Sequence, residues 1–185
     1  TWGMPRGGTD IDAALSMTTA MPAFGYGVLD ILVHQYRDAV LVADLPRQRT
    51  FRESDFSRQP DPYRSRLHTL QQPGTTIRLN RDIENCKVKL SSQTRAVVDL
   101  NYISSGLSVV GDKTSLQDAT QGFMRRFTEL LNHVNEKPDV IFLTGGMSRA
   151  PYIHALLANY FPDARMVRGD PDLGVVAGLA YVAAY

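Results

Sequence analysis

Apolar and polar residues follow a helical period between residues 76 and 91. Four apolar side chains are spaced by four, three and four positions: Leu79, Ile83, Cys86 and Leu90. This spacing predicts a helix that packs one face into a core. Glu84, Lys87 and Ser91 are spaced by three and four positions on a neighbouring face, so an acid, an amine and a hydroxyl line up there. Solvated helices also carry such sets, and spacing alone leaves both interpretations open.

The same kind of pattern predicts the other elements. Helices are expected over 7–21, from Thr114 to about 134, over 149–161 and over 171–184, with strands over 95–103, 106–112, 140–144 and 164–167. The strands at 95–103 and 106–112 would form a hairpin. The order of elements indicates an α/β chain of two subdomains, which we place at 1–112 and 113–185.

For two of these helices the sequence also predicts which residues are buried. The first should bury Ile11, Ala14, Leu15 and Thr18. The long helix should begin at Thr114, with Gln117 as its capping-box partner. Its expected buried stripe is Leu116, Phe123, Phe127, Leu130 and Val134.

A basic stretch interrupts this order. Residues 47–66 hold six arginines against Glu53, Asp55 and Asp61, with Pro60 and Pro62 and few aliphatic residues. This composition predicts a solvated loop with at most one short helix, within an exposed insertion of about 47–74. A basic protein-docking surface is the alternative. Between 23 and 42 only a short strand or helix near 39–42 is expected.

Composition and net charge limit the classes of function that the chain can have. The chain has 185 residues, of which 43% are hydrophobic, and a net charge of +1, which gives no field to attract nucleic acid or an acidic membrane. Its most apolar stretch, from Leu173, is too short for a membrane span. The single cysteine fits a reducing, cytoplasmic compartment. Because the sequence opens without methionine, we expect it to be part of a longer polypeptide.

The usual catalytic signatures are weak. The four histidines are scattered without acids or cysteine at metal-ligand spacing, so no zinc site is predicted. Cys86 falls on an apolar stripe and is interpreted as a core residue. Neither GxxxxGK[ST] nor GxGxxG occurs, which disfavours phosphate-loop and dinucleotide folds.

A glycine turn is the strongest candidate for binding. The sequence "DVIFLTGGMSRAP" runs from Asp139 to Pro151. In it, an apolar run typical of an interior strand is followed by Gly145 and Gly146. Glycine allows the backbone to approach a ligand closely, and helix N-termini attract anions. Many α/β units have such turns without a ligand, so a structural role is equally open here.

Three segments together resemble one family. "GGTDIDAAL", "IENCKVKLSS" and "VIFLTGGMSRAP", the last followed by "GDPDLGVVAGLA", are similar to segments of DnaK-type heat-shock chaperones, in the same order. Within this family the resemblance is closest to the shorter YegD-like chaperones. It implies the second lobe of an actin-like ATPase, a ribonuclease H-like fold, with a partial sheet and a helical and hairpin subdomain.

The resemblance gives the polar helix face a role. It implies that Glu84 accepts hydrogen bonds from ribose hydroxyls, that Lys87 donates to the ribose and that Ser91 reaches the purine edge. Val88 stands where many relatives carry an arginine on one face of the purine.

It also assigns roles to the glycine turns. Gly145 and Gly146 would let the backbone approach the nucleotide, and the Arg149 guanidinium would stack on adenine. Asp172 corresponds to a polar position near the purine, and Gly8 to the turn that opens the second lobe.

The family's phosphate loops and catalytic acids would lie upstream of Thr1. The chain would therefore bind the adenosine of ATP or ADP and be inactive alone, with no catalytic residue and with Mg²⁺ bound only in the complete protein. An adenine nucleotide is the expected ligand, and clients and co-chaperones are the expected protein partners. If the first strands of the sheet are missing, the fragment would self-associate through an unpaired sheet edge.

Two other classes of protein remain open. A sugar or carboxylate kinase of the same superfamily also ends in a similar glycine turn, but the face of Glu84, Lys87 and Ser91 argues against it. A filament-forming actin-like protein is the non-enzymatic alternative, and it would polymerise with nucleotide.

Overall fold

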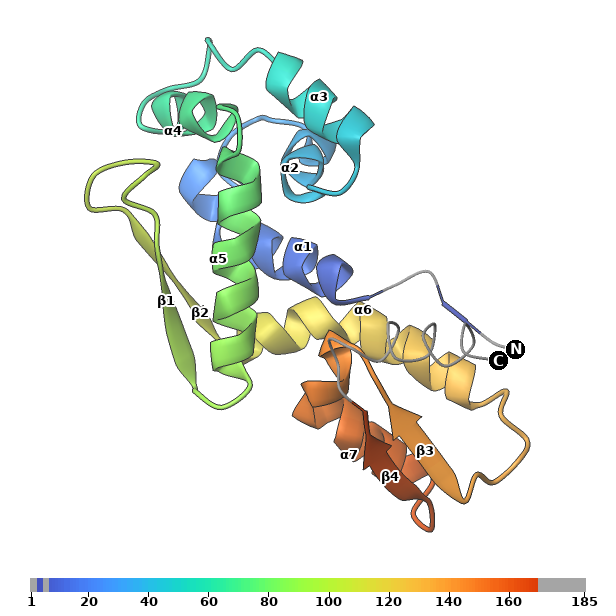
Figure 1. Ribbon diagram of the computed structural model, residues 1–185. Helices are drawn as coiled ribbons and strands as arrows, with labels where there is room; N and C mark the ends of the chain where they lie inside the picture. Colours follow the sequence, from blue (N-terminus) through green and yellow to red (C-terminus); the bar gives the residue numbers. More distant parts are fainter. Residues whose placement is uncertain (1–2, 5–6, 170–185) are drawn as a thin grey trace, which may run out of the picture. The chain divides into compact units, whose positions relative to one another are not determined.

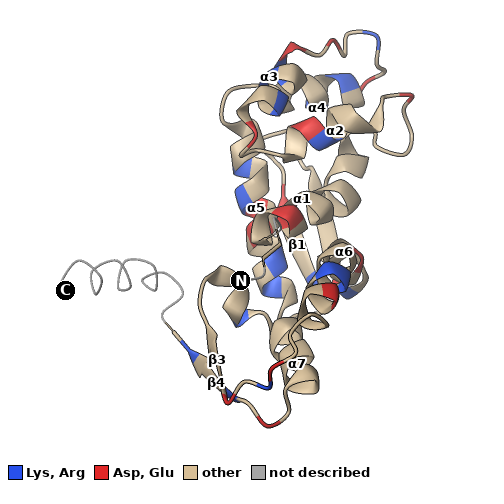
Figure 2. Cartoon of the chain, turned by 90° about the vertical axis from the view of Figure 1, so that its right-hand side faces the viewer, with Lys and Arg blue, Asp and Glu red and all other residues tan. Residues whose placement is uncertain are grey.

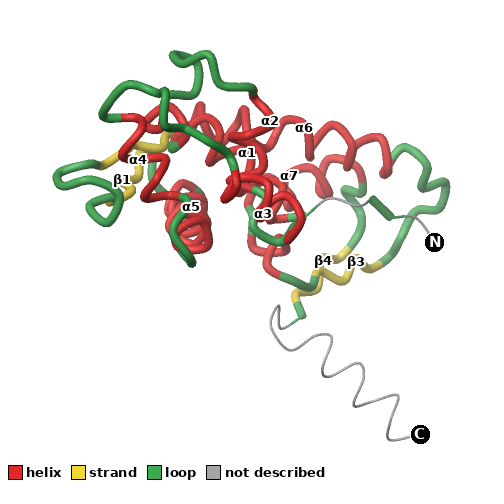
Figure 3. The backbone as a smooth tube through the Cα atoms, turned by 90° about the horizontal axis from the view of Figure 1, so that it is seen from above, coloured by secondary structure: helices red, strands yellow, loops and turns green. Residues whose placement is uncertain are grey.

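The chain is a mixed α/β protein with two short, two-stranded sheets among its described residues (Figure 3). The computed structural model describes residues 3–4 and 7–169. Its helices are α1 (Gly8–Thr19), α2 (Val33–Val40), α3 (Leu45–Glu53), α4 (Tyr63–Leu70), α5 (Thr75–Leu90), α6 (Lys113–Leu131) and α7 (Pro151–Tyr160), with 3-10 turns η1 (Met21–Phe24) and η2 (Gly146–Arg149). Its strands are β1 (Arg95–Asp99), β2 (Ser108–Asp112), β3 (Val140–Leu143) and β4 (Arg165–Arg168).

Contacts divide the chain into two units, which are described separately. The hairpin unit comprises residues 9–123, and the turn unit comprises residues 1–8 with 124–185. The helix predicted over 171–184 lies outside the described residues.

Helix α5 organises the hairpin unit. Its predicted apolar face is confirmed, because Leu79, Ile83, Cys86 and Leu90 are all buried. Strands β1 and β2 pack along this helix (Figure 1). Helices α2 and α4 also contact α5.

The predicted hairpin is confirmed. Strands β1 and β2 are antiparallel, and Arg95 pairs with Asp112 at one end. Ala96 faces inward, directly opposite Gly111. A Cβ atom on Gly111 would lie 2.7 Å from Cys86 Sγ, so α5 packs directly on the strand backbone at this point. Such a close approach requires glycine.

The prediction of a solvated loop over 47–66 is wrong, because α3 and α4 form there. Asp44 caps α3, and its side chain accepts a hydrogen bond from Arg47 N at 3.2 Å. Phe51 and Phe56 are buried, with ring centroids 5.8 Å apart. A few large aromatic side chains thus supply the core that the sparse aliphatic residues did not indicate.

Several arginines of this segment are paired with acids. Arg47 lies 3.1 Å from Asp38, and Arg49 lies 2.8 Å from Glu53. Arg64 pairs with Asp61. Both basic and acidic residues occur around α3 and α4 (Figure 2), which weakens the alternative of a basic docking surface.

Helix α1 buries a different face from the one predicted. Ile11 and Leu15 are buried as expected, but Ala14 is half-buried and Thr18 is exposed. Asp12 is buried instead. Its carboxylate is accommodated because it meets a lysine of α5, a long-range contact that helical periodicity does not report.

Helix α6 also begins differently from the prediction. Asp112, and not a capping box of Thr114 and Gln117, caps it, because its carboxylate accepts from Ser115 N at 2.8 Å. In the predicted stripe, Leu116 and Phe123 are buried, and Phe127 and Leu130 are half-buried. Val134 lies beyond the end of the helix. The helix ends at Leu131, so the stripe is shorter than predicted.

In the turn unit, the predicted strands are confirmed. Strand β3 pairs with β4 in parallel, with Val140 opposite Arg165. Strand β3 is not buried along its length, since Phe142 is 62% exposed and Leu143 is buried. Among the described residues β4 is its only paired neighbour, so the expected interior position is not observed there.

Candidate functional site

The structure shows how the predicted polar face of α5 is exposed. Glu84 and Ser91 are exposed, and Lys87 is half-buried. Ser91 follows the last residue of α5, and its hydroxyl donates to Lys87 O at 3.4 Å. The structure therefore places two of the three predicted residues on α5 and the third at its C-cap. Val88 lies on the same side of the helix and is 61% exposed.

Lys87 has a partner that the sequence did not indicate. Its Nζ lies 2.7 Å from Asp12 Oδ1 of α1, with side-chain exposures of 14% for the lysine and 3% for the aspartate. Burial raises the pKa of Asp12 above its usual value of 3.8, and Lys87 acts in the opposite direction. The ion pair joins α1 to α5 and fixes the stem of Lys87.

The turn unit contains the second predicted surface. Gly145 has φ of +81°, a conformation that favours glycine. Among the described residues, no atom lies within 4 Å of a Cβ placed on Gly145 or on Gly146, so the backbone there borders open space. The predicted helix start at Arg149 is wrong: η2 begins at Gly146 and ends at Arg149, and α7 begins at Pro151. Proline favours the first turn of a helix, which explains this later start.

Polar contacts hold the turn. Ser148 N donates to Gly145 O at 3.0 Å, and Ser148 is buried. His154 Nε2 lies 2.6 Å from Ser148 O. Arg149, at the end of η2, is exposed. Gly145, Gly146 and Arg149 thus share one turn.

The two remaining predicted residues are not placed beside these surfaces. Gly8 is the first residue of α1 and is half-buried. Asp172 lies outside the described residues. The α5 face and the glycine turn belong to different units, and each stands by itself.

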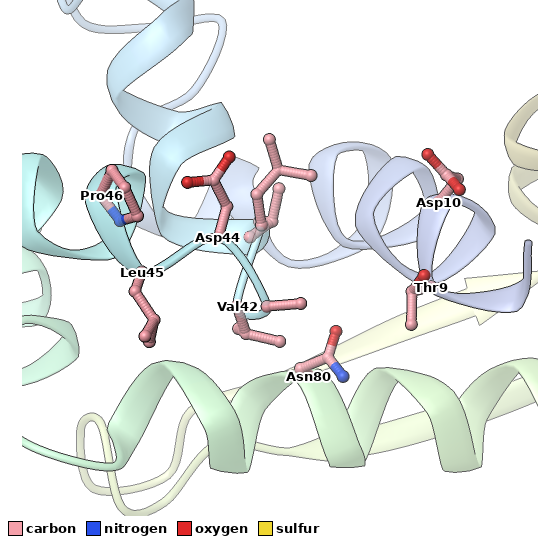
Figure 4. A pocket seen from close by; sticks show the side chains of 10 residues that line it. Thr9, Asp10, Val42, Asp44, Leu45, Pro46 and Asn80 are labelled. Atoms are coloured by element: carbon pink, nitrogen blue, oxygen red, sulfur yellow. The ribbon is translucent and has the colours of Figure 1, made fainter. Parts of the chain in front are cut away.

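A pocket in the hairpin unit was not predicted. It has a volume of about 550 Å³, and Asn80 points into it from α5 (Figure 4). Its lining residues are Thr9, Asp10, Val40, Leu41, Val42, Ala43, Asp44, Leu45, Pro46 and Asn80. Asn80 precedes Glu84 by one helical turn, so the pocket adjoins the predicted polar face. Its lining includes two carboxylates and no lysine or arginine, which disfavours a phosphate group inside it.

Asp12 and Asn80 are the residues that sequence reasoning missed. Asp12 occurs in "GGTDID", where alternate aspartates suggest a solvated first turn. Asn80 borders the apolar stripe of α5, but only its neighbours from α1 and from the connection between α2 and α3 make a pocket there. Nothing in the local spacing indicates either contact.

Comparison of the sequence with models of known protein families finds no match. Across residues 3–4 and 7–169, no three histidine, cysteine or carboxylate residues gather as metal ligands would. No helix in this part of the chain is long and apolar enough to cross a membrane.

Proposed function

We propose that the chain supplies the adenosine-binding part of a DnaK-like chaperone ATPase, with the fold of the second lobe of an actin-like ATPase. The observation that carries this proposal is the exposed Glu84 side chain one helical turn before Lys87, whose ammonium Asp12 anchors at 2.7 Å. An acceptor and a donor on one rigid helix suit a pair of neighbouring hydroxyl groups. The ribose of ATP or ADP carries such a pair.

The rest of the α5 face suits the base. Val88 offers an exposed apolar side chain one residue after Lys87. Ser91 offers a hydroxyl one turn further along, where it can meet a polar edge of a purine. A nucleoside would thus lie with its ribose near Glu84 and its base toward Ser91.

The glycine turn, taken by itself, is proposed as a further surface that can contact an adenine nucleotide. Within the described part of the chain, open space borders the backbone at Gly145 and Gly146. Arg149 carries a planar guanidinium that can stack on adenine. The proposal assigns nucleoside binding to this chain and no hydrolytic step, and it leaves Mg²⁺, clients and co-chaperones to the complete ATPase.

Calorimetric titration of the full-length protein with ATP and ADP tests the proposal. Glu84→Ala should weaken both affinities by roughly ten- to a hundredfold, because charge-assisted hydrogen bonds contribute about 1.5–3 kcal/mol. Arg149→Ala should cost about 0.5–2 kcal/mol in binding free energy. Each variant should lose as much affinity for ATP as for ADP, since neither side chain is assigned to the γ-phosphate.

Arg58→Ala is the control, because Arg58 is exposed between α3 and α4 and is outside both surfaces. Its affinity for either nucleotide should match that of the unmodified protein. If Glu84→Ala and Arg149→Ala both bind ATP and ADP with unchanged affinity, the α5 face and the glycine turn are structural and the proposal is wrong.

A further inference from the structure

Asp12 is a buried carboxylate that forms an ion pair with Lys87. The residue is 2% exposed, and its Oδ1 lies 2.7 Å from Lys87 Nζ. Among the described residues, this oxygen has no hydrogen-bond partner apart from that ammonium. The compensation for the burial of this oxygen therefore comes from Lys87.

Such a pair is an expensive way to hold two helices together. Removing two charges from water costs several times what a surface ion pair returns, and well-packed apolar residues often serve as well or better. Here burial is the largest influence on Asp12 and raises its pKa, and Glu84 raises it further. The arrangement is thus poorly explained by stability alone, which directs attention to what it does for Lys87.

The pair orders a side chain that is otherwise flexible. Lysine has a four-carbon stem and three N–H donors, and it loses considerable rotamer entropy when it is held in one place. Asp12 engages the ammonium at 2.7 Å, while 14% of the lysine side chain remains exposed. Glu84, which is exposed, precedes Lys87 by one helical turn. The ordering is therefore complete before a ligand arrives.

We infer that Asp12 is a positioning residue: it holds the Lys87 ammonium in place, one helical turn from Glu84, so that a remaining N–H donates to a ribose hydroxyl. The inference rests on the proposed function and deepens it. Asp12 itself would not touch the nucleotide. Its contribution is preorganisation, because a donor already in place costs less to bind.

Calorimetric titration of the full-length protein with ADP and with 2′,3′-dideoxy-ADP tests this role. Asp12→Asn should weaken ADP binding about tenfold and leave the dideoxy affinity unchanged, because only ADP carries the hydroxyl groups that Lys87 would meet. The same substitution in a Lys87→Met background should have no further effect on ADP. The matched control is Asp118→Asn, an exposed aspartate of α6, which should leave both affinities unchanged.

Asp12→Glu covers the case in which Asp12→Asn does not fold. It keeps the negative charge and moves it by one methylene. The preference for ADP over 2′,3′-dideoxy-ADP should therefore fall while the fold persists. Equal losses for ADP and the dideoxy analogue, or no loss at all, would overturn the inference.

Glu84→Ala separates this inference from the proposed function. If Glu84→Ala weakens ADP binding but Asp12→Asn does not, only the role of Asp12 is wrong. If Glu84→Ala binds ADP normally, the proposed function fails, and the inference fails with it.

Discussion

Replacing Phe51 with alanine is expected to lower the free energy of unfolding by about 3–5 kcal/mol. The side chain is fully buried at 0% exposure, and its ring packs on that of Phe56. Truncation would remove this contact and leave a cavity that α3 and α4 cannot fill without moving. Urea denaturation followed by far-UV circular dichroism measures the change.

Arg58→Ala provides the comparison, because this exposed side chain lies in the same segment. Its substitution should change the free energy of unfolding by no more than about 0.5 kcal/mol. A loss below about 1 kcal/mol in Phe51→Ala would show that α3 and α4 do not share a core, and that the segment behaves as the loop its composition predicted.

Lys87→Met is expected to destabilise the fold by about 3–5 kcal/mol near neutral pH, because it leaves the Asp12 carboxylate buried without its partner. Burial already raises the pKa of Asp12 above 3.8, and removing Lys87 removes the influences that lower it. The folded pKa of Asp12 then rises further in this variant.

The sign of the pH dependence follows. A carboxyl group whose folded pKa exceeds its unfolded value favours folding when protonated, so its contribution is most favourable below 3.8 and is lost as pH rises to the folded pKa. The destabilisation of Lys87→Met relative to the unmodified protein should therefore grow as pH rises above the folded pKa of Asp12 in the unmodified protein, which itself lies above 3.8. Urea denaturation at a series of pH values measures this slope.

The double variant Asp12→Asn/Lys87→Met lacks both charges. Its difference from Lys87→Met should widen in favour of the double variant as pH rises. If Lys87→Met shows the same loss at every pH, Asp12 stays in one protonation state and the buried pair does not titrate as described.

The sequence predicted best where periodicity is strong and neighbours are local. The stripe from Leu79 to Leu90 identified α5, and two short apolar runs identified the β1–β2 hairpin. Helices α3 and α4 were missed because their core depends on a few large side chains, such as Phe51, among many arginines. Tertiary burial of aromatics decides the structure there, and a residue-by-residue pattern does not report it.

The candidate site was predictable to the extent that it lies on one helix. Glu84, Lys87 and Ser91 share a face because of helical spacing, and the structure places them so. The Asp12 partner was not predictable, because the ion pair joins two helices far apart in the sequence. The pocket beside Asn80 required three separate segments to meet.

The packing of Cys86 against Gly111 gives the chain a built-in probe of local opening. Cys86 is the single cysteine, and burial raises its pKa, which suppresses the reactive thiolate. Alkylating reagents would reach Sγ when the β1–β2 hairpin separates from α5. The labelling rate, compared with that of a free thiol, would then report how often this separation occurs, without any introduced label.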